Sequence, residues 1–125
     1  MILNSDDSKP IYVQIAEWLE TEILSGHFQV DDKVHSQYQL AEMFTINPAT
    51  AAKGLNLLAE DEILYKRRGL GMFVADQARE RILQKRKEQT LKKLIADLVD
   101  EAERLDVDEA ELISMIQNVR KMRGK

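Results

Sequence analysis

The stretch from Val34 to Ala75, VHSQYQLAEMFTINPATAAKGLNLLAEDEILYKRRGLGMFVA, decides the expected fold. Ser36 is a good helix N-cap, because its hydroxyl can accept a hydrogen bond from a backbone N–H of the first turn. The apolar residues Leu40, Ala41 and Phe44 follow at the three-to-four spacing of one helix face. The first part of the stretch therefore predicts a short helix with one buried face.

A second helix is expected after a turn. Asn47 is another good N-cap, and Pro48 suits the first helical turn because its missing N–H would be unpaired there anyway. At about 100° per residue, one side of this helix is apolar and the opposite side is free to meet a partner. The buried side would carry Ala51, Gly54, Leu55 and Leu58, and the free side Ala49, Ala52, Lys53 and Asn56.

The end of the stretch predicts a β-hairpin. Two short β-prone runs, Ile63–Tyr65 and Met72–Val74, flank the turn Arg68-Gly69-Leu70-Gly71. The charged run Lys66–Arg68 and the slim Gly69 suit an approach to a phosphate backbone. Helix, turn, helix and hairpin in this order predict a winged helix-turn-helix, whose second helix enters the major groove of DNA. Taken alone, the hairpin could equally be a surface hairpin with a solvated charge run.

Length and composition limit the classes of protein. The 125 residues allow one small core plus an appendage. The chain has no cysteine, and its loop Asp and His residues fix no ligand geometry, so we expect no metal and no other cofactor. No apolar run approaches the roughly 20 residues of a membrane span, and the N-terminus lacks a signal pattern, so a cytoplasmic protein without membrane contact is expected.

The charge is unevenly distributed. The net charge is −4, with 6 Lys and Arg against 11 Asp and Glu in residues 1–75, and 12 against 11 in residues 76–125. Non-specific binding to nucleic acid is mainly electrostatic, so this chain is not expected to coat DNA indiscriminately. Affinity for DNA would depend on a local cluster, and Lys66–Arg68 supplies half of the basic residues of the first part.

A scaffold helix is expected upstream, from about Pro10 to Ser25, preceded by Asp7 or Ser8 and stopped by Gly26. Trp18 lies on its apolar stripe and is interpreted as a packing residue. Val34 is expected to add a short strand to the hairpin.

Downstream, residues 76–125 predict two helices. The segment Asp76–Arg104 has no Gly or Pro, and it carries apolar residues at the 4-3-4-3 spacing of a short coiled-coil-like seam. Asp108, three residues before Glu111, resembles a capping box at the start of a second helix.

Because two amphipathic helices cannot bury both stripes alone, a twofold homodimer is expected, with a hairpin folded back on the first domain as the alternative. The basic run at the start of the long helix is interpreted as a solvated face. The predicted interface comprises Leu91, Leu94, Ile95, Leu98, Ala102, Leu105, Leu112, Ile113, Ile116 and Val119.

The chain resembles the GntR family of bacterial transcription regulators, and within it the short YtrA-like branch. The resemblance is carried by PIYVQIAEWLETEILSG at residues 10–26, Ser36 with Leu40-Ala41, INPATAAKGLNLL at 46–58, and RRGLGMFV at 67–74. It implies a mainly α fold with a small β-hairpin: a winged helix-turn-helix in residues 1–75 followed by a two-helix dimerisation module in residues 76–125. It also implies repression of the protein's own operon, often one encoding an ABC-type transporter.

The family's DNA contacts carry over unevenly. The family usually has Pro-Ser-x-Arg before Leu-Ala, with the arginine contacting DNA, whereas this chain has His35-Ser36-Gln37-Tyr38. Many members also have arginines at the positions of Pro48 and Ala52. The resemblance therefore implies base contacts from small and amide side chains, and an A·T-leaning palindrome with half-sites about one helical turn apart. The predicted DNA-binding residues are Ser36, Gln37, Tyr38, Asn47, Pro48, Ala49, Thr50, Ala52, Lys53, Lys66, Arg67, Arg68 and Gly69, with Asn56 as a further base contact.

The sequence also bears on other classes of function. No Ser-His-Asp or Cys-His set and no phosphate-cradling loop is present, so an enzyme is not expected. A winged helix turned into a protein-interaction module is the main alternative, because the first part is acidic and the family's arginines are missing. A third alternative is a repressor that also senses a ligand, which would shift the separation of the two recognition helices. The sequence does not indicate which effector this would be. Only 50 residues follow the wing, too few to enclose a metabolite in a pocket of their own, so we expect an effector to bind at the dimer interface or between domains.

Overall fold

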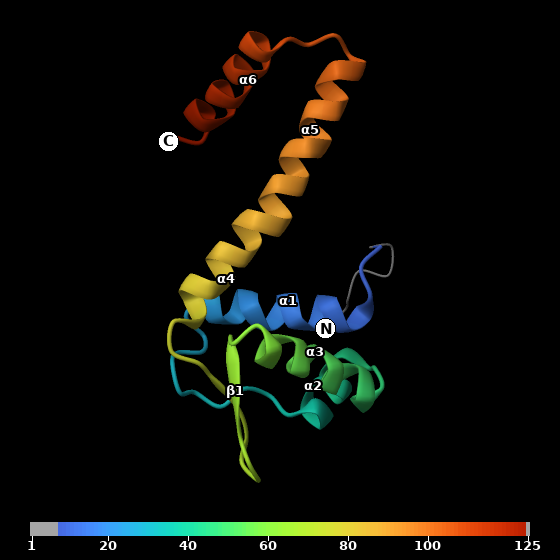
Figure 1. The fold of residues 1–125 in the computed structure, drawn as a ribbon, viewed down its shortest axis with the longest axis vertical. Coiled ribbons are helices and arrows are strands. Elements are labelled where there is room, and N and C mark those ends of the chain that lie inside the picture. Colours follow the sequence, from blue (N-terminus) through green and yellow to red (C-terminus); the bar gives the residue numbers. More distant parts are fainter. Residues whose placement is uncertain (1–7, 125) are drawn as a thin grey trace. The chain divides into compact units, whose positions relative to one another are not determined.

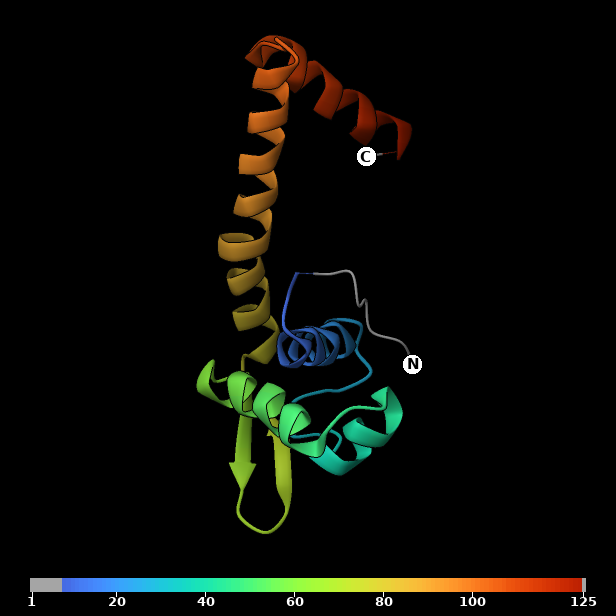
Figure 2. The same ribbon diagram turned by 90° about the vertical axis from the view of Figure 1, so that its right-hand side faces the viewer.

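The computed structural model describes residues 8–124, so Asp7, expected just before the first helix, lies outside the described residues. The elements are α1 (Ile11–Leu24), α2 (Gln37–Phe44), α3 (Pro48–Glu60), β1 (Leu64–Arg67), β2 (Gly71–Val74), α4 (Ala78–Arg86), the π-helical turn η1 (Lys87–Leu91), α5 (Lys92–Arg104) and α6 (Glu109–Met122) (Figures 1 and 2). The chain divides into two compact units after Gln84, within α4.

The first unit is a winged helix-turn-helix, as predicted. Helix α3 packs against both α1 and α2, and the hairpin of β1 and β2 follows it directly (Figure 2). The strands are antiparallel, with Tyr65 opposite Phe73 and Lys66 opposite Met72. The expected third strand is a single bridge, in which Lys33 pairs with Phe73 and the N–H of Val34 donates to the carbonyl of Met72.

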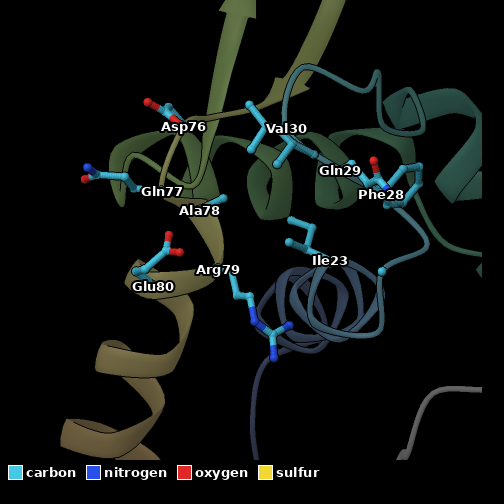
Figure 3. A pocket seen from close by; sticks show the side chains of 11 residues that line it. Ile23, Phe28, Gln29, Val30, Asp76, Gln77, Ala78, Arg79 and Glu80 are labelled. Carbon is cyan, nitrogen blue, oxygen red and sulfur yellow. The ribbon is translucent and has the colours of Figure 1, made fainter.

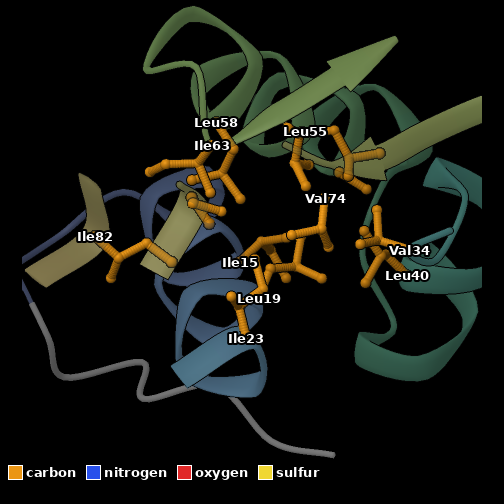
Figure 4. Close-up of a cluster of buried hydrophobic side chains, with 14 of the residues drawn as sticks. Ile15, Leu19, Ile23, Val34, Leu40, Leu55, Leu58, Ile63, Val74 and Ile82 are labelled. Atoms are coloured by element: carbon orange, nitrogen blue, oxygen red, sulfur yellow. The ribbon is translucent and has the colours of Figure 1, made fainter. Parts of the chain in front are cut away.

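One hydrophobic core holds this unit together (Figure 4). Ile15 and Leu19 of α1 are fully buried, and they meet Leu58 of α3 and Ile63 before β1. Ile82 of α4 is also fully buried in this core, which explains why the first unit extends past the wing as far as Gln84. Trp18 packs as predicted, with its ring 5.1 Å from that of Phe44 in an edge-to-face arrangement. Among the described residues, no helix is long and apolar enough to cross a membrane.

Two element boundaries differ from the sequence expectation. Pro10, rather than Ser8, occupies the N-cap of α1. No side chain caps this helix, and the proline ring fixes the backbone φ angle at its start. Strand β1 ends at Arg67 and strand β2 begins at Gly71, so three residues, Arg68-Gly69-Leu70, connect the strands instead of the four that were expected. The N–H of Leu70 donates to the carbonyl of Arg67 over 2.9 Å, and Gly69 takes a φ of +78° that suits glycine.

The second unit consists of η1, α5 and α6. Asp108 caps α6 as predicted, because its Oδ1 accepts a hydrogen bond from the N–H of Glu111 over 2.9 Å. The long helical segment contains one π-helical turn at Lys87–Leu91, which the sequence pattern did not predict. Leu105 lies just beyond the last residue of α5, at its C-cap.

Helix α3 touches α1 at a glycine. A Cβ atom on Gly54 would lie 2.8 Å from the carbonyl oxygen of Tyr12 and 3.2 Å from the Cβ of Ile15. The first distance is well inside van der Waals contact and involves backbone, which cannot rotate away. The absence of a side chain at Gly54 therefore sets how closely α3 approaches α1.

We expect Gly54→Ala to destabilise the protein, although alanine is the better helix former by about 1 kcal/mol. Overpacking of a well-packed contact costs roughly 1–3 kcal/mol, so the clash should dominate. The measurement is urea unfolding of the full chain, with Asn56→Ala on the exposed side of α3 as a control that should change little. A Gly54→Ala variant more stable than the wild type would contradict this packing.

Candidate nucleic-acid interface

The N-terminus of α2 is fixed by a complete capping box. The Oγ of Ser36 accepts from the N–H of Gln39 over 3.1 Å, and the Oε1 of Gln39 accepts from the N–H of Ser36 over 2.8 Å. Gln39 was not among the predicted site residues, although an amide three residues after a serine is the sequence signature of this motif. The box fixes the backbone next to Gln37 and Tyr38, two predicted DNA contacts.

The N-terminus of α3 is exposed and is fixed by Asn47. The Oδ1 of Asn47 accepts a hydrogen bond from the N–H of Ala49 over 2.7 Å. This bond uses one of the two lone pairs of the oxygen, and the amide N–H groups of Asn47 can donate to a base or phosphate. Pro48 and Ala49 are exposed beside it, and Thr50 is half-buried.

A hollow of about 330 Å³ lies between the start of α2, the side of α3 and the hairpin. It brings together six of the predicted DNA-contacting residues: Ser36, Gln37, Tyr38, Ala52, Asn56 and Lys66. Tyr38 is 69% exposed, so its phenol lies on the surface rather than in the core. The hollow is also lined by Lys33, Val34, His35, Leu55, Leu70, Gly71 and Met72.

The two faces of the wing carry different side chains. Side chains alternate along a strand, and Lys66 lines the hollow together with Met72, its partner across the hairpin. Arg67 belongs to the other face, where its guanidinium carbon lies 5.3 Å from the centre of the Phe73 ring. The predicted basic cluster is therefore split: Lys66 faces α3, Arg67 faces away, and Arg68 and Gly69 are exposed at the tip.

Lys33 is a basic residue of the hollow that sequence reasoning missed. Its side chain crosses the hairpin at Gly71, where an added Cβ would lie 3.1 Å from the Lys33 Cε. The bridge to Phe73 holds the backbone of Lys33 against β2. Local sequence gave no signal for this contact, because it depends on which residue of the loop before α2 pairs with the wing.

Lys53 lies away from the hollow. Its Nζ is 4.7 Å from the centre of the Tyr12 ring of α1, a cation–π contact. Lys53 remains exposed, so a phosphate could still reach it, but only at the flank of α3 that faces α1.

The predicted interface residues of the second unit form an open apolar surface within the chain. Leu94 is 58% exposed, and Leu98, Ile113 and Val119 are each at least two-fifths exposed. Ala102 is the exception at 7%, because it packs where α5 meets α6. Leu91, Ile95, Leu105 and Ile116 are exposed as well, and Leu112 is half-buried.

A second hollow of the first unit, about 370 Å³ in volume, lies between the end of α1, the following loop and the start of α4 (Figure 3). The apolar side chains of Ile23, Val30 and Ala78 line it, whereas Gln77 points away from them. Ligand sites need polar groups that converge on their occupant. We therefore assign no ligand to this hollow.

Comparison with known proteins identifies the first unit. The family model described as bacterial regulatory proteins, gntR family, matches residues 11–74. The repressor YtrA of Bacillus subtilis is 33% identical over 94 residues, which cover 72% of each chain. The repressor NagR of the same organism is 37% identical over 84 residues, and the matched part covers 67% of this chain but only 35% of NagR.

Solved structures agree over most of the chain. A GntR-family transcriptional regulator from Bacteroides thetaiotaomicron superposes with a TM-score of 0.77 at 28% identity, covering 91% of this chain and 99% of that one. The DNA-binding domain of AraR, solved in complex with the operator ORX1, superposes with a TM-score of 0.56 at 28% identity over 60% of this chain and 95% of that chain. The fold is therefore a GntR-type winged-helix DNA-binding domain with C-terminal helices.

A hydrogen bond from a titratable tyrosine joins the wing to the loop before α2. The hydroxyl of Tyr65 donates to Oδ1 of Asp31 over 2.7 Å, and this hydrogen bond is the main cause that raises the pKa of Tyr65, opposed by the charge of Arg67. The neutral phenol makes the bond. Its contribution to stability is therefore complete below the ordinary tyrosine pKa of about 10 and is lost as the pH rises through the raised value.

We expect Asp31→Gly to lower the pKa of Tyr65. Glycine keeps the φ of +69° that Asp31 adopts, so the change removes the acceptor without straining the loop. Ultraviolet absorbance titration of the tyrosines measures the shift, with Tyr65→Phe identifying which transition belongs to Tyr65. If the pKa of Tyr65 is the same in Asp31→Gly as in the wild type, the hydrogen bond between the Tyr65 hydroxyl and Asp31 does not form.

Proposed function

The chain belongs to the GntR family of bacterial regulatory proteins, and on this premise we propose that it is a dimeric repressor that binds a palindromic operator of its own operon. The observation that carries the proposal is the hollow beside α3, which is lined by the exposed side of that helix together with Lys33 and Lys66. Repression is supported by the names of the matched relatives NagR and YtrA. The resemblance to the YtrA-like branch adds the expectation that the regulated operon encodes an ABC transporter.

The proposed reading of DNA follows from the exposed groups of this face. The N-terminal turn of α3 would enter the major groove, with Ala49 and Ala52 against thymine methyl groups and the Asn47 amide as a donor. Ser36, Gln37, Tyr38, Thr50 and Lys53 would contact the backbone. The wing would lie along the phosphates, with Lys66 toward α3, Lys33 across the hairpin at Gly71 and Arg68 at the tip. Pro48 and Gly69 allow close approach, and Arg67 contributes from the outer face.

The dimer is proposed on the apolar surface of the second unit. Soluble monomers rarely expose large contiguous apolar patches, and here both α5 and α6 present large aliphatic side chains to solvent. Residues 76–125 would form the dimerisation module, and two DNA-binding units related by a twofold axis would match a palindrome.

We expect this protein to bind DNA from upstream of its own gene much more tightly than a scrambled duplex. The logarithm of the binding constant should fall steeply with the logarithm of the salt concentration, by about 0.9 for each phosphate contacted. The measurement is a salt titration by fluorescence anisotropy. Equal and feeble binding to both duplexes would contradict the repressor and favour the protein-interaction module, for which the acidic balance of residues 1–75 is the supporting observation.

Lys33→Ala and Lys66→Ala should each weaken binding to specific and scrambled duplexes alike and reduce the salt slope by about one. Both lysines contribute charge without base recognition, so the ratio of specific to non-specific affinity should stay constant. Lys9→Ala is the matched control, because Lys9 pairs with Glu17 at 2.8 Å and does not line the hollow. Variants of Lys33 and Lys66 that bind like the control would place the DNA on a different face.

A further inference from the structure

The C-terminal unit has opposite charges at its two ends. Helix α6 turns back from the end of α5, so the two helices meet at residues 105–108 and diverge from there (Figures 1 and 2). The closed end, residues 97–111, carries eight acidic residues and one basic residue. The open end, residues 85–96 together with 112–124, carries eight basic residues and one acidic residue. The unit is therefore strongly dipolar along its length.

Local helix electrostatics does not account for this pattern in α5. Negative charge is favoured at a helix N-terminus and positive charge at a C-terminus, and α6 follows this rule with Glu109 and Glu111 at its start and Arg120 and Lys121 at its end. The last turn of α5 instead contains Glu101 and Glu103, with Arg104 as its only basic residue. Ion pairs within the helix, such as Arg104 with Glu101 at 3.0 Å, are exposed and contribute little.

Several of these charges flank the apolar surface between the two helices. A groove of about 400 Å³ near the closed end is lined by Glu103 and Glu109 together with Val99, Ala102, Val107, Leu112, Ile113 and Ile116. Lys92 lies seven residues before Val99 and therefore on the same side of α5. Arg120 lies four residues after Ile116 on the same side of α6. The apolar face thus has acids at the closed end and bases at the open end.

We propose that this face binds the same face of a second copy in an antiparallel orientation, with the closed end of each unit against the open end of the other. This inference rests on the dimer proposed above and adds its orientation. Glu103 and Glu109 of one copy would then lie near Lys92 and Arg120 of the other, twice over because of the twofold axis. In a parallel dimer the acidic end of one copy would instead face the acidic end of the other, and the basic ends would face each other; like charges across an interface are costly.

The antiparallel order also explains why the apolar stripes of α5 and α6 are left open within one chain. Each stripe ends near a charge cluster that selects the opposite end of its partner. Charge complementarity would thus fix the register, and burial of Leu98, Ile116 and their neighbours would supply the affinity.

Charge reversal tests the orientation in the full-length protein. One variant, Lys92→Glu with Arg120→Glu, makes the open end acidic; a second, Glu103→Lys with Glu109→Lys, makes the closed end basic. A third combines all four changes. Sedimentation equilibrium at low salt, where screening is weak, gives the dimer dissociation constant of each. Circular dichroism checks that each variant remains helical, and Lys9→Glu is the control for a charge reversal in the first unit.

The antiparallel dimer predicts that each double variant raises the dissociation constant by about tenfold or more and that the fourfold variant restores it to near the wild-type value. A parallel dimer predicts no change in either double variant, since one like-charge contact replaces another; that result would overturn the orientation and leave the dimer standing. Failure of the fourfold variant to restore a well-folded dimer would also overturn it. A wild-type protein that stays monomeric at all concentrations would refute both the orientation and the dimer.

Discussion

The contact of α3 with α1 at Gly54 is the constraint on which the rest of the DNA-binding unit depends. Any side chain at this position would push the backbone of Tyr12 away, since the added Cβ would lie 2.8 Å from its carbonyl oxygen. The close approach lets Leu55 and Leu58 reach the core formed by Ile15 and Leu19. With one side of α3 buried in this way, its exposed side and its N-terminal turn are presented in a fixed direction.

The wing acquires its position from the same core and from a loop distant in sequence. Val74 of β2 is buried against the core, and residues 31–34 form hydrogen bonds along β2. Strand alternation then assigns each basic residue to a face: Lys66 toward α3, and Arg67 toward Phe73. A run of three adjacent positive residues in sequence therefore becomes two separate surfaces, and Lys33, whose side chain crosses the hairpin at Gly71, lines the hollow together with Lys66.

Much of this fold was predictable because its signals are local. Ser36 and Asn47 accept the backbone hydrogen bonds expected of N-caps, and the apolar spacing of α3 identified Ala51, Leu55 and Leu58 as buried. The contacts that sequence reasoning missed are those between distant segments. The pairing of Lys33 with Phe73 and the cation–π contact of Lys53 with Tyr12 depend on how loops and helices meet in space. The one-residue shift in the hairpin turn moved Gly71 into a strand, which a simple count of turn residues could not anticipate.

The central claim is that two copies of this chain present their α3 helices to adjacent major grooves of one DNA duplex. Hydroxyl-radical footprinting of both strands on the DNA upstream of the gene tests it most directly. We expect two symmetric protected half-sites in an A·T-leaning palindrome, with centres about one helical turn apart, near 10 base pairs. A single asymmetric, G·C-rich protected site would contradict the paired recognition helices.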